Sequence, residues 1–202
     1  MIIGATRFEN NKYYNSLISI TSSKVNYFDK KILVPFGEFL PFRDSLNFLE
    51  RIAGPNNFSN GNDQRLIYLP NNISFIPVIC YEIVFYWKLL NKSNYKSNFI
   101  INITNDFWFG KYIGPYQHFY LTKIRAAEFN KPIIRVSNNG ISAVIDNDGS
   151  IIKSTKLNNF EKFKHKLFLK ENINFVKLHL ILKIYFLIIF LSITLYYSRK
   201  NV

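Results

Sequence analysis

Short runs of apolar, mostly β-branched residues recur along the first three quarters of the chain and predict buried strands. Each run has the length of a strand and is bordered by turn-forming or polar residues. The predicted strands are Leu17–Ile20, Ile32–Phe36, Ile73–Ile79, Phe99–Ile103 and Pro132–Val136. Farther along, Ser142–Ile145, the turn residues Asp146–Gly149 and Ser150–Ile152 predict a hairpin.

Helical spacing of apolar positions occurs between the predicted strands. Tyr116–Asn130 has the pattern of a helix with one apolar face, and Phe42–Ile52 shows a shorter pattern of the same kind. The segment Gly54–Gln64 is dense in Gly, Pro, Asn and Ser, which predicts a loop. Strands that alternate with helices predict an α/β layered domain over residues 1–155.

The end of the chain has a different pattern, in which Leu178–Tyr197 is apolar on all faces and Ile184–Tyr197 carries no charge. Twenty residues of helix are long enough to cross the hydrocarbon core of a bilayer, so this segment predicts a transmembrane helix. The alternative is a helix buried in a protein core. Residues 156–177 would form a basic connector, and 178–197 the membrane segment.

The formal net charge of +13 suits an anionic membrane surface better than nucleic acid. Residues 151–202 carry 10 Lys or Arg against 2 Asp or Glu, so the excess lies beside the most apolar stretch. No zinc-ligand spacing or RNA-binding signature accompanies the charge. For the orientation of the tail, Arg199 and Lys200 favour a cytoplasmic C-terminus, whereas the basic run Lys153–Lys177 favours the opposite.

The chain has one cysteine, so no internal disulfide is possible. Cys80 ends the predicted strand Ile73–Ile79, where a sharp turn can expose its sulfur. A reactive thiolate needs a nearby cation and a base, and Lys30 could stabilise both a thiolate and an oxyanion. On these residues alone the simpler alternatives stand: an inert core cysteine, a solvated Lys30 and a surface carboxylate at Glu38.

Polar and aromatic residues follow the predicted strand Phe99–Ile103. Asn105 comes soon after this strand, and Trp108 and Phe109 follow it. Amide groups and an exposed Trp at a strand end suit a binding pocket. Core packing explains Phe109 equally well.

Taken together, these residues form an ordered set of motifs that resembles one enzyme family. The motifs are Lys30 with Leu33–Glu38, Cys80-Tyr81-Glu82, Thr104-Asn105-Asp106 with Trp108-Phe109-Gly110, Gly114-Pro115 with Gln117-His118, Arg125-Ala126 with Glu128, and Arg135 with Asn138–Ser142. In this order they resemble the nitrilase-like domain of apolipoprotein N-acyltransferases, and the resemblance extends into the terminal membrane helix. It implies an α/β fold, a partial nitrilase-type αββα sandwich, followed by a C-terminal transmembrane helix.

The resemblance implies transfer of an acyl chain from a phospholipid to the N-terminal cysteine amine of apolipoproteins through a Cys thioester. Cys80 would be the nucleophile and Lys30 the group that stabilises the oxyanion. Glu38 and Glu82 match carboxylates near the family's site, and Glu38 would position Lys30. These four side chains are expected to converge in one pocket, with the Lys30 amine near the Cys80 sulfur.

Substrate contacts are implied at Tyr81, Asn105, Trp108 and Phe109. No metal or cofactor is expected. The implied partners are a phospholipid acyl donor, a lipidated apolipoprotein acceptor and the membrane, with no nucleic acid. The implied location is the bacterial inner membrane, with the catalytic domain on the extracytoplasmic side.

One departure from the family pattern concerns the general base. The family places a base glutamate well upstream of the lysine motif, but Lys30 is preceded by only 29 residues. Glu9, the only acidic residue before Asp29, is not in a buried-strand pattern. We expect the chain to be a fragment, a split-gene product that needs a separate upstream chain, or the product of a decayed gene. In each case the chain alone should have little activity. The rival functions are a non-catalytic membrane-anchored remnant and a nitrilase-type amidase.

Overall fold

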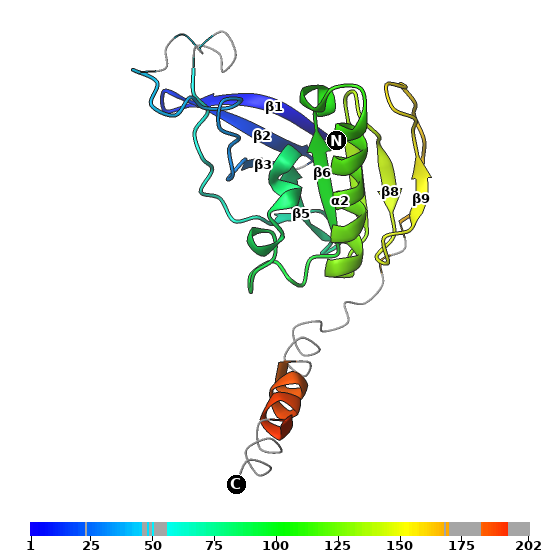
Figure 1. Ribbon diagram of the computed structural model, residues 1–202. Coiled ribbons are helices and arrows are strands. Elements are labelled where there is room, and N and C mark those ends of the chain that lie inside the picture. The colour runs from blue at the N-terminus through cyan, green and yellow to red at the C-terminus, as the bar shows by residue number, and fades with distance from the viewer. Residues whose placement is uncertain are drawn as a thin grey trace. The chain divides into compact units, whose positions relative to one another are not determined.

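Two β-sheets and one long helix organise the larger part of the chain (Figure 1). The computed structural model describes residues 1–22, 24–45, 48, 50, 56–167, 169 and 183–193. The chain divides into two compact units, Met1–Lys170 and Glu171–Val202. The first unit contains both sheets and the candidate site, and each unit is described by itself.

The first sheet is antiparallel and has the strand order β1 (Ile2–Glu9), β2 (Lys12–Ile20) and β3 (Val25–Asp29). Asn10 and Asn11 join β1 to β2 in a tight turn, both with positive φ, as a two-residue hairpin turn requires. The predicted strand Leu17–Ile20 is confirmed as the second half of β2. The strands β1 and β3 went unpredicted. Most residues of β1 are exposed, and β3 is short and includes Asn26 and Asp29, so neither forms a continuous apolar run.

The second sheet has the order β4–β5–β6–β7–β8–β9. Its centre is formed by three parallel strands, β5 (Ser74–Ile79), β6 (Phe99–Thr104) and β7 (Ile133–Ser137), which confirm three of the predicted strands. Antiparallel strands lie on both sides: β4 (Ile67–Tyr68), β8 (Ala143–Ile145) and β9 (Ile151–Ser154). Strands β8 and β9 form the predicted hairpin.

Helix α2 (Ile113–Phe129) confirms the predicted helix and begins three residues earlier than predicted. It ends at Asn130, which has the left-handed conformation common where helices stop. Three short 3-10 turns follow strands or one another: η2 (Cys80–Val84), η3 (Tyr86–Lys88) and η4 (Asp106–Phe109).

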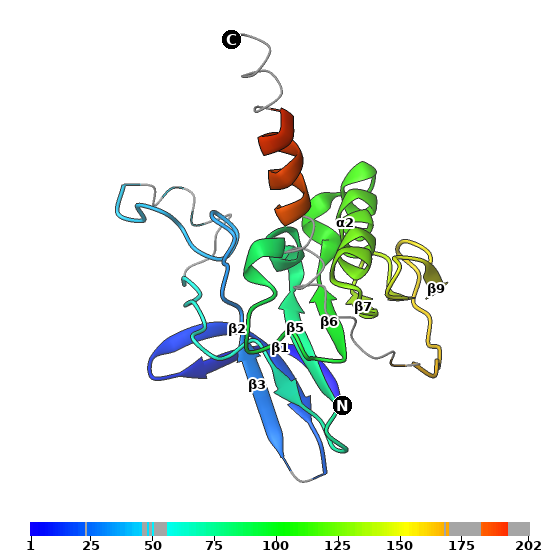
Figure 2. The same ribbon diagram turned by 90° about the horizontal axis from the view of Figure 1, so that it is seen from below.

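The two sheets and α2 form successive layers, as the view from below shows (Figure 2). One core cluster lies between the sheets and includes Leu17, Phe28 and Phe75. The other lies between the second sheet and α2 and includes Ile76 and Phe119. Since Phe75 and Ile76 are neighbours in β5, the alternation of a strand explains why the fully buried β5 contributes to both clusters.

The prediction of a strand at Ile32–Phe36 is wrong. This segment is a tight loop, in which the backbone N–H of Val34 donates to Glu38 Oε2 (2.8 Å) and Phe36 has a φ of 62°. Pro35 has no N–H for a sheet ladder, which disfavours a central strand here. The apolar run therefore closes around the Glu38 carboxylate.

The second unit contains a helix over residues 183–193 with exposed side chains. No helix in the described part of the chain is long and apolar enough to cross a membrane. The predicted span Leu178–Tyr197 includes 178–182 and 194–197, which lie outside the described residues. Of the predicted helix Phe42–Ile52, residues 46, 47, 49, 51 and 52 also lie outside them.

Candidate functional site

The cysteine lies where the buried strand β5 turns sharply. All six residues of β5 are buried, and Cys80 follows them with a φ of 53°. The left-handed region is uncommon for a residue with a side chain, and such backbone strain of about 1–3 kcal/mol persists only where the surroundings enforce it. The thiol is free and half-buried. A strained turn at the end of a strand is a way to present a nucleophile.

Glu82 lies two residues after this turn and is completely buried. Its Oε2 accepts the backbone N–H of Ile79 (2.9 Å), directly before the cysteine. Arg65, also buried, donates to both carboxylate oxygens (2.7 and 2.9 Å). Burial alone would raise the pKa of Glu82, but the hydrogen bonds and charge of Arg65 outweigh it and hold that pKa below its usual value. The carboxylate is therefore ionised and stabilises the turn.

Lys30 follows the last residue of β3 and is 1% exposed. Its backbone N–H donates to the carbonyl of Asn15 (2.8 Å), and its carbonyl accepts from Gly61 (2.9 Å). A Cβ at position 61 would lie 2.2 Å from the Asp29 carbonyl oxygen, so only glycine allows this close approach. The main chain at Lys30 is thus fixed from two sides.

The Lys30 side chain ends in an ion pair, with Nζ 2.6 Å from Glu38 Oε2. Glu38 Oε1 accepts from the Asn15 amide (2.7 Å), and the N–H of Val34 donates to Oε2. These contacts hold the Glu38 carboxylate and the Lys30 amine together.

One carboxylate brings the lysine segment and the cysteine turn together. Oε1 of Glu82 accepts the backbone N–H of Lys31 (2.9 Å), and Oε2 accepts that of Ile79. The residue after Lys30 and the residue before Cys80 thus bind the same side chain. A direct approach of Lys30 Nζ to the thiol stays a prediction.

The sequence motifs gave no role to a second buried cluster beside Cys80. Asp106 Oδ1 lies 2.9 Å from His118 Nδ1, and Asp106 Oδ2 accepts from Arg135 Nη2 (2.6 Å). The three residues come from η4, α2 and β7, and all are at least 98% buried. Each belongs to one of the resemblance motifs, which was the only signal in the sequence that could have found them.

Burial and charge set the protonation of this cluster. Burial alone would raise the pKa of Asp106, but the His118 hydrogen bond and the Arg135 charge lower it to about 2. The pKa of His118 lies below its usual value, chiefly because of burial, although Asp106 opposes the shift. Asp106 is ionised at neutral pH and the imidazole is mostly neutral.

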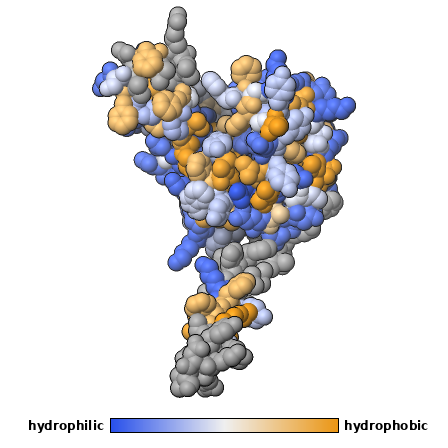
Figure 3. All heavy atoms as spheres, viewed as in Figure 1, coloured by the Kyte–Doolittle hydropathy of each residue, from blue (hydrophilic) through white to orange (hydrophobic). Residues whose placement is uncertain are grey.

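Aromatic side chains surround the cysteine turn. The ring centroid of Tyr81 lies 6.1 Å from that of Phe109, and Phe109 lies 4.8 Å from His118. Trp108 is 69% exposed, and Asn105 accepts the N–H of Phe107 and so caps η4. Figure 3 shows apolar side chains interrupting the polar surface over the face that carries η2, η3 and α2. Of the predicted substrate contacts, Tyr81 and Trp108 are accessible to solvent. The Phe109 ring packs near Tyr81 and His118, and the Asn105 side chain caps η4.

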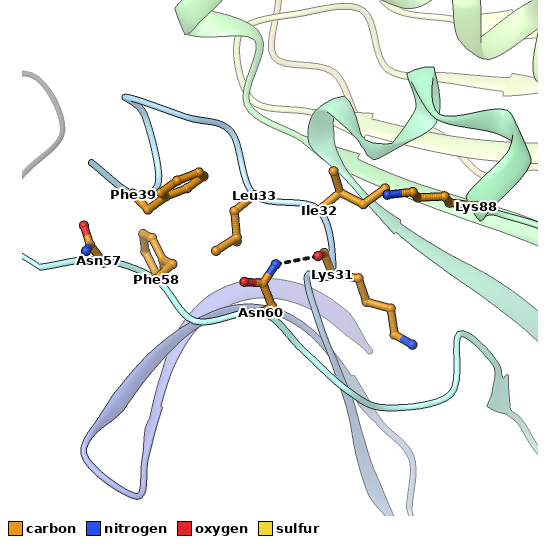
Figure 4. A pocket seen from close by; sticks show the side chains of 8 residues that line it. All are labelled: Lys31, Ile32, Leu33, Phe39, Asn57, Phe58, Asn60 and Lys88. Carbon is orange, nitrogen blue, oxygen red and sulfur yellow. Dashed lines mark hydrogen bonds between the residues drawn. The ribbon is translucent and has the colours of Figure 1, made fainter. Parts of the chain in front are cut away.

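An open pocket of about 420 Å³ lies beside the lysine segment (Figure 4). It is lined by Lys31, Ile32, Leu33, Phe39, Asn57, Phe58, Asn60 and Lys88. The Asn60 amide donates to the Lys31 carbonyl (2.7 Å), which joins two of its walls. The size is typical of a small-molecule site, and the mixed lining suits an amphipathic ligand. Within the described ranges, no three His, Cys, Asp or Glu side chains group as metal ligands do.

Comparisons with known proteins concern the family and the fold of this chain. A sequence model of the family described as carbon-nitrogen hydrolase matches residues 1–162. An apolipoprotein N-acyltransferase of Allorhizobium ampelinum is 41% identical over 169 residues, which cover 78% of this chain and 32% of that protein. Another, of Rickettsia prowazekii, is 42% identical over 138 residues, covering 68% and 27%. The chain thus spans about a third of the length of the curated relatives it matches.

The fold is also similar to that of a nitrilase-superfamily protein of Saccharomyces cerevisiae, with a TM-score of 0.58. The two are 19% identical, and the match covers 79% of this chain and 55% of the other. At that identity the likeness concerns the fold alone. It confirms the predicted nitrilase-type α/β fold.

Proposed function

Because this chain belongs to the carbon-nitrogen hydrolase family, we propose that it carries the nucleophile of an N-acyltransferase that matures lipoproteins. The acyl donor would be a phospholipid, and the acceptor the N-terminal cysteine amine of an apolipoprotein. The names of the relatives at about 40% identity support this substrate class. A family remnant without activity and an amidase are the alternatives that the test below separates.

One observation carries the proposal: a buried lysine and a strained cysteine are held to a common carboxylate. Glu82 binds the backbone beside Lys30 and the backbone beside Cys80. A solvated surface lysine would not be 1% exposed with its amine on Glu38, and an inert core cysteine needs no left-handed turn. The arrangement supports a thiol nucleophile beside a fixed positive charge.

The proposed reaction has two steps. The Cys80 thiolate attacks the ester carbonyl of the phospholipid, and Lys30 stabilises the oxyanion that forms. The ester C–O bond breaks, the lysophospholipid oxygen takes a proton, and an acyl thioester remains on Cys80. The acceptor amine then attacks the thioester, loses a proton, and releases the thiolate as an amide forms. Two bulky lipids can therefore use one site in turn.

The proton of the thiol needs an acceptor. Glu82 is saturated by hydrogen bonds and an arginine, and Glu38 is bound to Lys30. Both are better suited to positioning than to accepting a proton. We therefore assign the general base to a carboxylate outside the described part of the chain, supplied by a segment or a partner chain that completes the site.

Lipid substrates imply access from a bilayer. The accessible Trp108 and Tyr81 would contact the acyl chain, since both present aromatic surface beside the cysteine turn. The apolar segment 178–197 would anchor the chain, and the basic residues before it would meet anionic headgroups. We place the chain in the bacterial inner membrane with the Cys80 domain on the extracytoplasmic side.

The test looks for an acyl thioester on Cys80. The full chain is purified in detergent, alone or co-expressed with the part of the Allorhizobium ampelinum relative outside the matched region. It is then incubated with phospholipid and measured by intact mass spectrometry. We expect a hydroxylamine-sensitive acyl adduct in the co-expressed sample and none with Cys80→Ala.

Two lysine variants make the test specific. Lys30→Met should slow acylation by about 10²–10³-fold, the typical cost of losing an oxyanion-stabilising group. Lys12→Met, on an exposed β2 residue, is the matched control and should acylate normally. If neither the chain alone nor the co-expressed sample forms an acyl adduct, the acyltransferase proposal is rejected. Release of ammonia from simple amides would favour the amidase.

A further inference from the structure

The pocket of about 420 Å³ lies beside the proposed reaction centre without contributing a reacting group to it. Its walls come from the loop after β3, the segment 56–60 and η3 (Figure 4). Lys30 and Lys31 are consecutive, but the Lys30 amine binds Glu38 whereas the Lys31 side chain lines the pocket. The backbone N–H of Lys31 donates to Glu82 (2.9 Å), the carboxylate that also holds the cysteine turn. A ligand in the pocket would therefore lie against the segment that carries the proposed oxyanion lysine.

The charge of the pocket is positive. Its lining, which consists of described residues, contains Lys31 and Lys88 and no carboxylate. Within the described ranges, neither of these two ammonium groups makes an ion pair or a hydrogen bond, whereas the buried Lys30 is paired with Glu38. Ammonium groups without a protein partner are available to an anion, and phosphate is an anion that lysine commonly binds.

Most of the remaining lining is apolar. The hydrocarbon comes from Ile32, Leu33, Phe39 and Phe58. Leu33 is buried, and the two Phe side chains are half-buried. A phosphate ion would gain nothing from this wall, whereas the hydrocarbon of an amphiphile would remove it from water. The lining thus suits a ligand with an anionic end and an apolar end.

Hydrogen bonds hold the walls of the pocket in one arrangement. The backbone N–H of Phe58 donates to the Glu38 carbonyl (2.8 Å), and the Asn60 amide donates to the Lys31 carbonyl (2.7 Å). The segment 56–60 is thus joined to the loop after β3 at two points. A pocket that is already formed saves a ligand the cost of ordering it.

We propose that this pocket binds the phosphate-bearing end of a phospholipid: the ammonium groups of Lys31 and Lys88 hold the phosphate, and Phe39 and Phe58 cover the hydrocarbon next to it. The inference rests on the proposed function in taking this phospholipid as the acyl donor, and it adds where the polar end of the donor lies. One acyl chain would then extend to the cysteine turn, and the second would stay on the apolar wall.

Acetylation of the lysines in the wild-type chain, measured residue by residue by mass spectrometry in dodecyl maltoside, provides the first test. The probe is dihexanoylphosphatidylglycerol, which carries the phosphodiester and has no amine to consume the reagent. At saturation it should slow acetylation of Lys31 and Lys88 by about tenfold or more, since an ammonium bound to phosphate is withheld from the reagent. Lys12, which is exposed on β2, should react at an unchanged rate. Unchanged rates at Lys31 and Lys88 would overturn the proposal.

Two further ligands separate the possible sources of the binding. Inorganic phosphate supplies the anion alone, and dihexanoylglycerol supplies the same two chains without phosphate. We expect neither to protect the two lysines at the concentration at which the phospholipid does. Equal protection by inorganic phosphate would reject an amphiphile site in favour of a simple anion site. Equal protection by dihexanoylglycerol would reject recognition of the phosphate.

Variants test the two halves of the pocket separately, with affinities measured by titration calorimetry. Lys31→Met and Lys88→Met should each weaken phospholipid binding by about tenfold, the loss expected when one charge-assisted hydrogen bond is removed. Phe39→Ala should weaken phospholipid binding and leave the weaker binding of inorganic phosphate unchanged. Lys12→Met is the matched control and should bind both ligands as the wild type does. Unchanged affinity in both pocket lysine variants would contradict the proposal.

Binding and acyl transfer are separate readouts. If the phospholipid protects both lysines but no thioester forms on Cys80 in the co-expressed sample, the proposed function fails and the pocket stands as a phospholipid site. If thioester forms at the wild-type rate in Lys31→Met and Lys88→Met at subsaturating phospholipid, the pocket does not hold the donor and the proposed function stands. If a variant fails to fold, protection of the wild-type lysines still decides.

Discussion

Replacing Glu82 by Gln should be among the most damaging conservative substitutions in this chain. The side chain is 0% exposed and accepts hydrogen bonds from Arg65, Ile79, Lys31 and Ile32. Glutamine keeps the shape but offers one acceptor oxygen, and its NH₂ group would face N–H donors. Removing one partner of a buried ion pair costs about 3–5 kcal/mol, because the other charge stays buried without compensation. The free energy of unfolding should fall by that amount.

The pH dependence gives a second, independent signature. The pKa of Glu82 is lower in the folded chain than in the unfolded chain. Between the two values the unfolded chain binds more protons, so this carboxylate's stabilisation is present above its unfolded pKa and is lost as pH falls. Glutamine does not titrate. The stability difference between wild type and Glu82→Gln should therefore narrow in acid.

The assay is urea denaturation of the full chain in mild detergent, at neutral and acidic pH. Glu128→Gln is the matched control, because Glu128 pairs with Arg125 one turn away on α2 and its side chain is 35% exposed. An i, i+3 helix pair is worth about 0.2–0.5 kcal/mol, and the more exposed Glu128 side chain makes its loss less costly than that of Glu82. If Glu82→Gln loses less than about 1 kcal/mol at neutral pH, the carboxylate does not hold the site together as described.

Three further outcomes follow from single contacts. Gly61→Ala should lower the free energy of unfolding by about 1–3 kcal/mol in urea denaturation, because its Cβ would lie 2.2 Å from the Asp29 carbonyl oxygen. Gly37→Ala is the control, since its Cβ would make only ordinary van der Waals contacts, and it should be nearly neutral. Since burial lowers the pKa of His118, the folded state loses stability as pH falls below the unfolded pKa of histidine, and His118→Phe should flatten that part of the pH–stability curve. Trp108→Ala should change stability by less than about 0.5 kcal/mol, because the side chain is 69% exposed, yet reduce thioester formation from phospholipid.

Burial on both faces gives the clearest strand signal in the sequence. The segments β5 and β6 are continuous apolar runs because a helix covers one face of the sheet and a second sheet the other. The exposed β1 has no such run and left no signal. Ile32–Phe36 has the composition of a strand, but its apolar residues follow from a loop that closes on Glu38, which composition does not distinguish.

The candidate site also has a part that could be predicted from the sequence and a part that could not. Cys80, Lys30 and Glu38 stand out because short motifs place each beside a strand end or a turn. Asp106, His118 and Arg135 do not stand out as a cluster in the sequence, because they lie 12 to 29 residues apart and come from three different elements. Only the packing of α2 on the second sheet brings them together, and no local pattern encodes that packing.

Two buried carboxylates lie near the cysteine turn without being placed to meet a substrate. Glu82 holds the backbone directly before Cys80, and Asp106 binds His118 and Arg135 in the neighbouring cluster. Buried charges of this kind are weak contributors to net stability, because their desolvation offsets much of their attraction. A strained turn, however, needs surroundings that permit one geometry, and hydrogen-bonded ion pairs restrict direction more than apolar packing does. The charges around Cys80 are therefore better understood as fixing where the sulfur points than as adding to the stability of the fold.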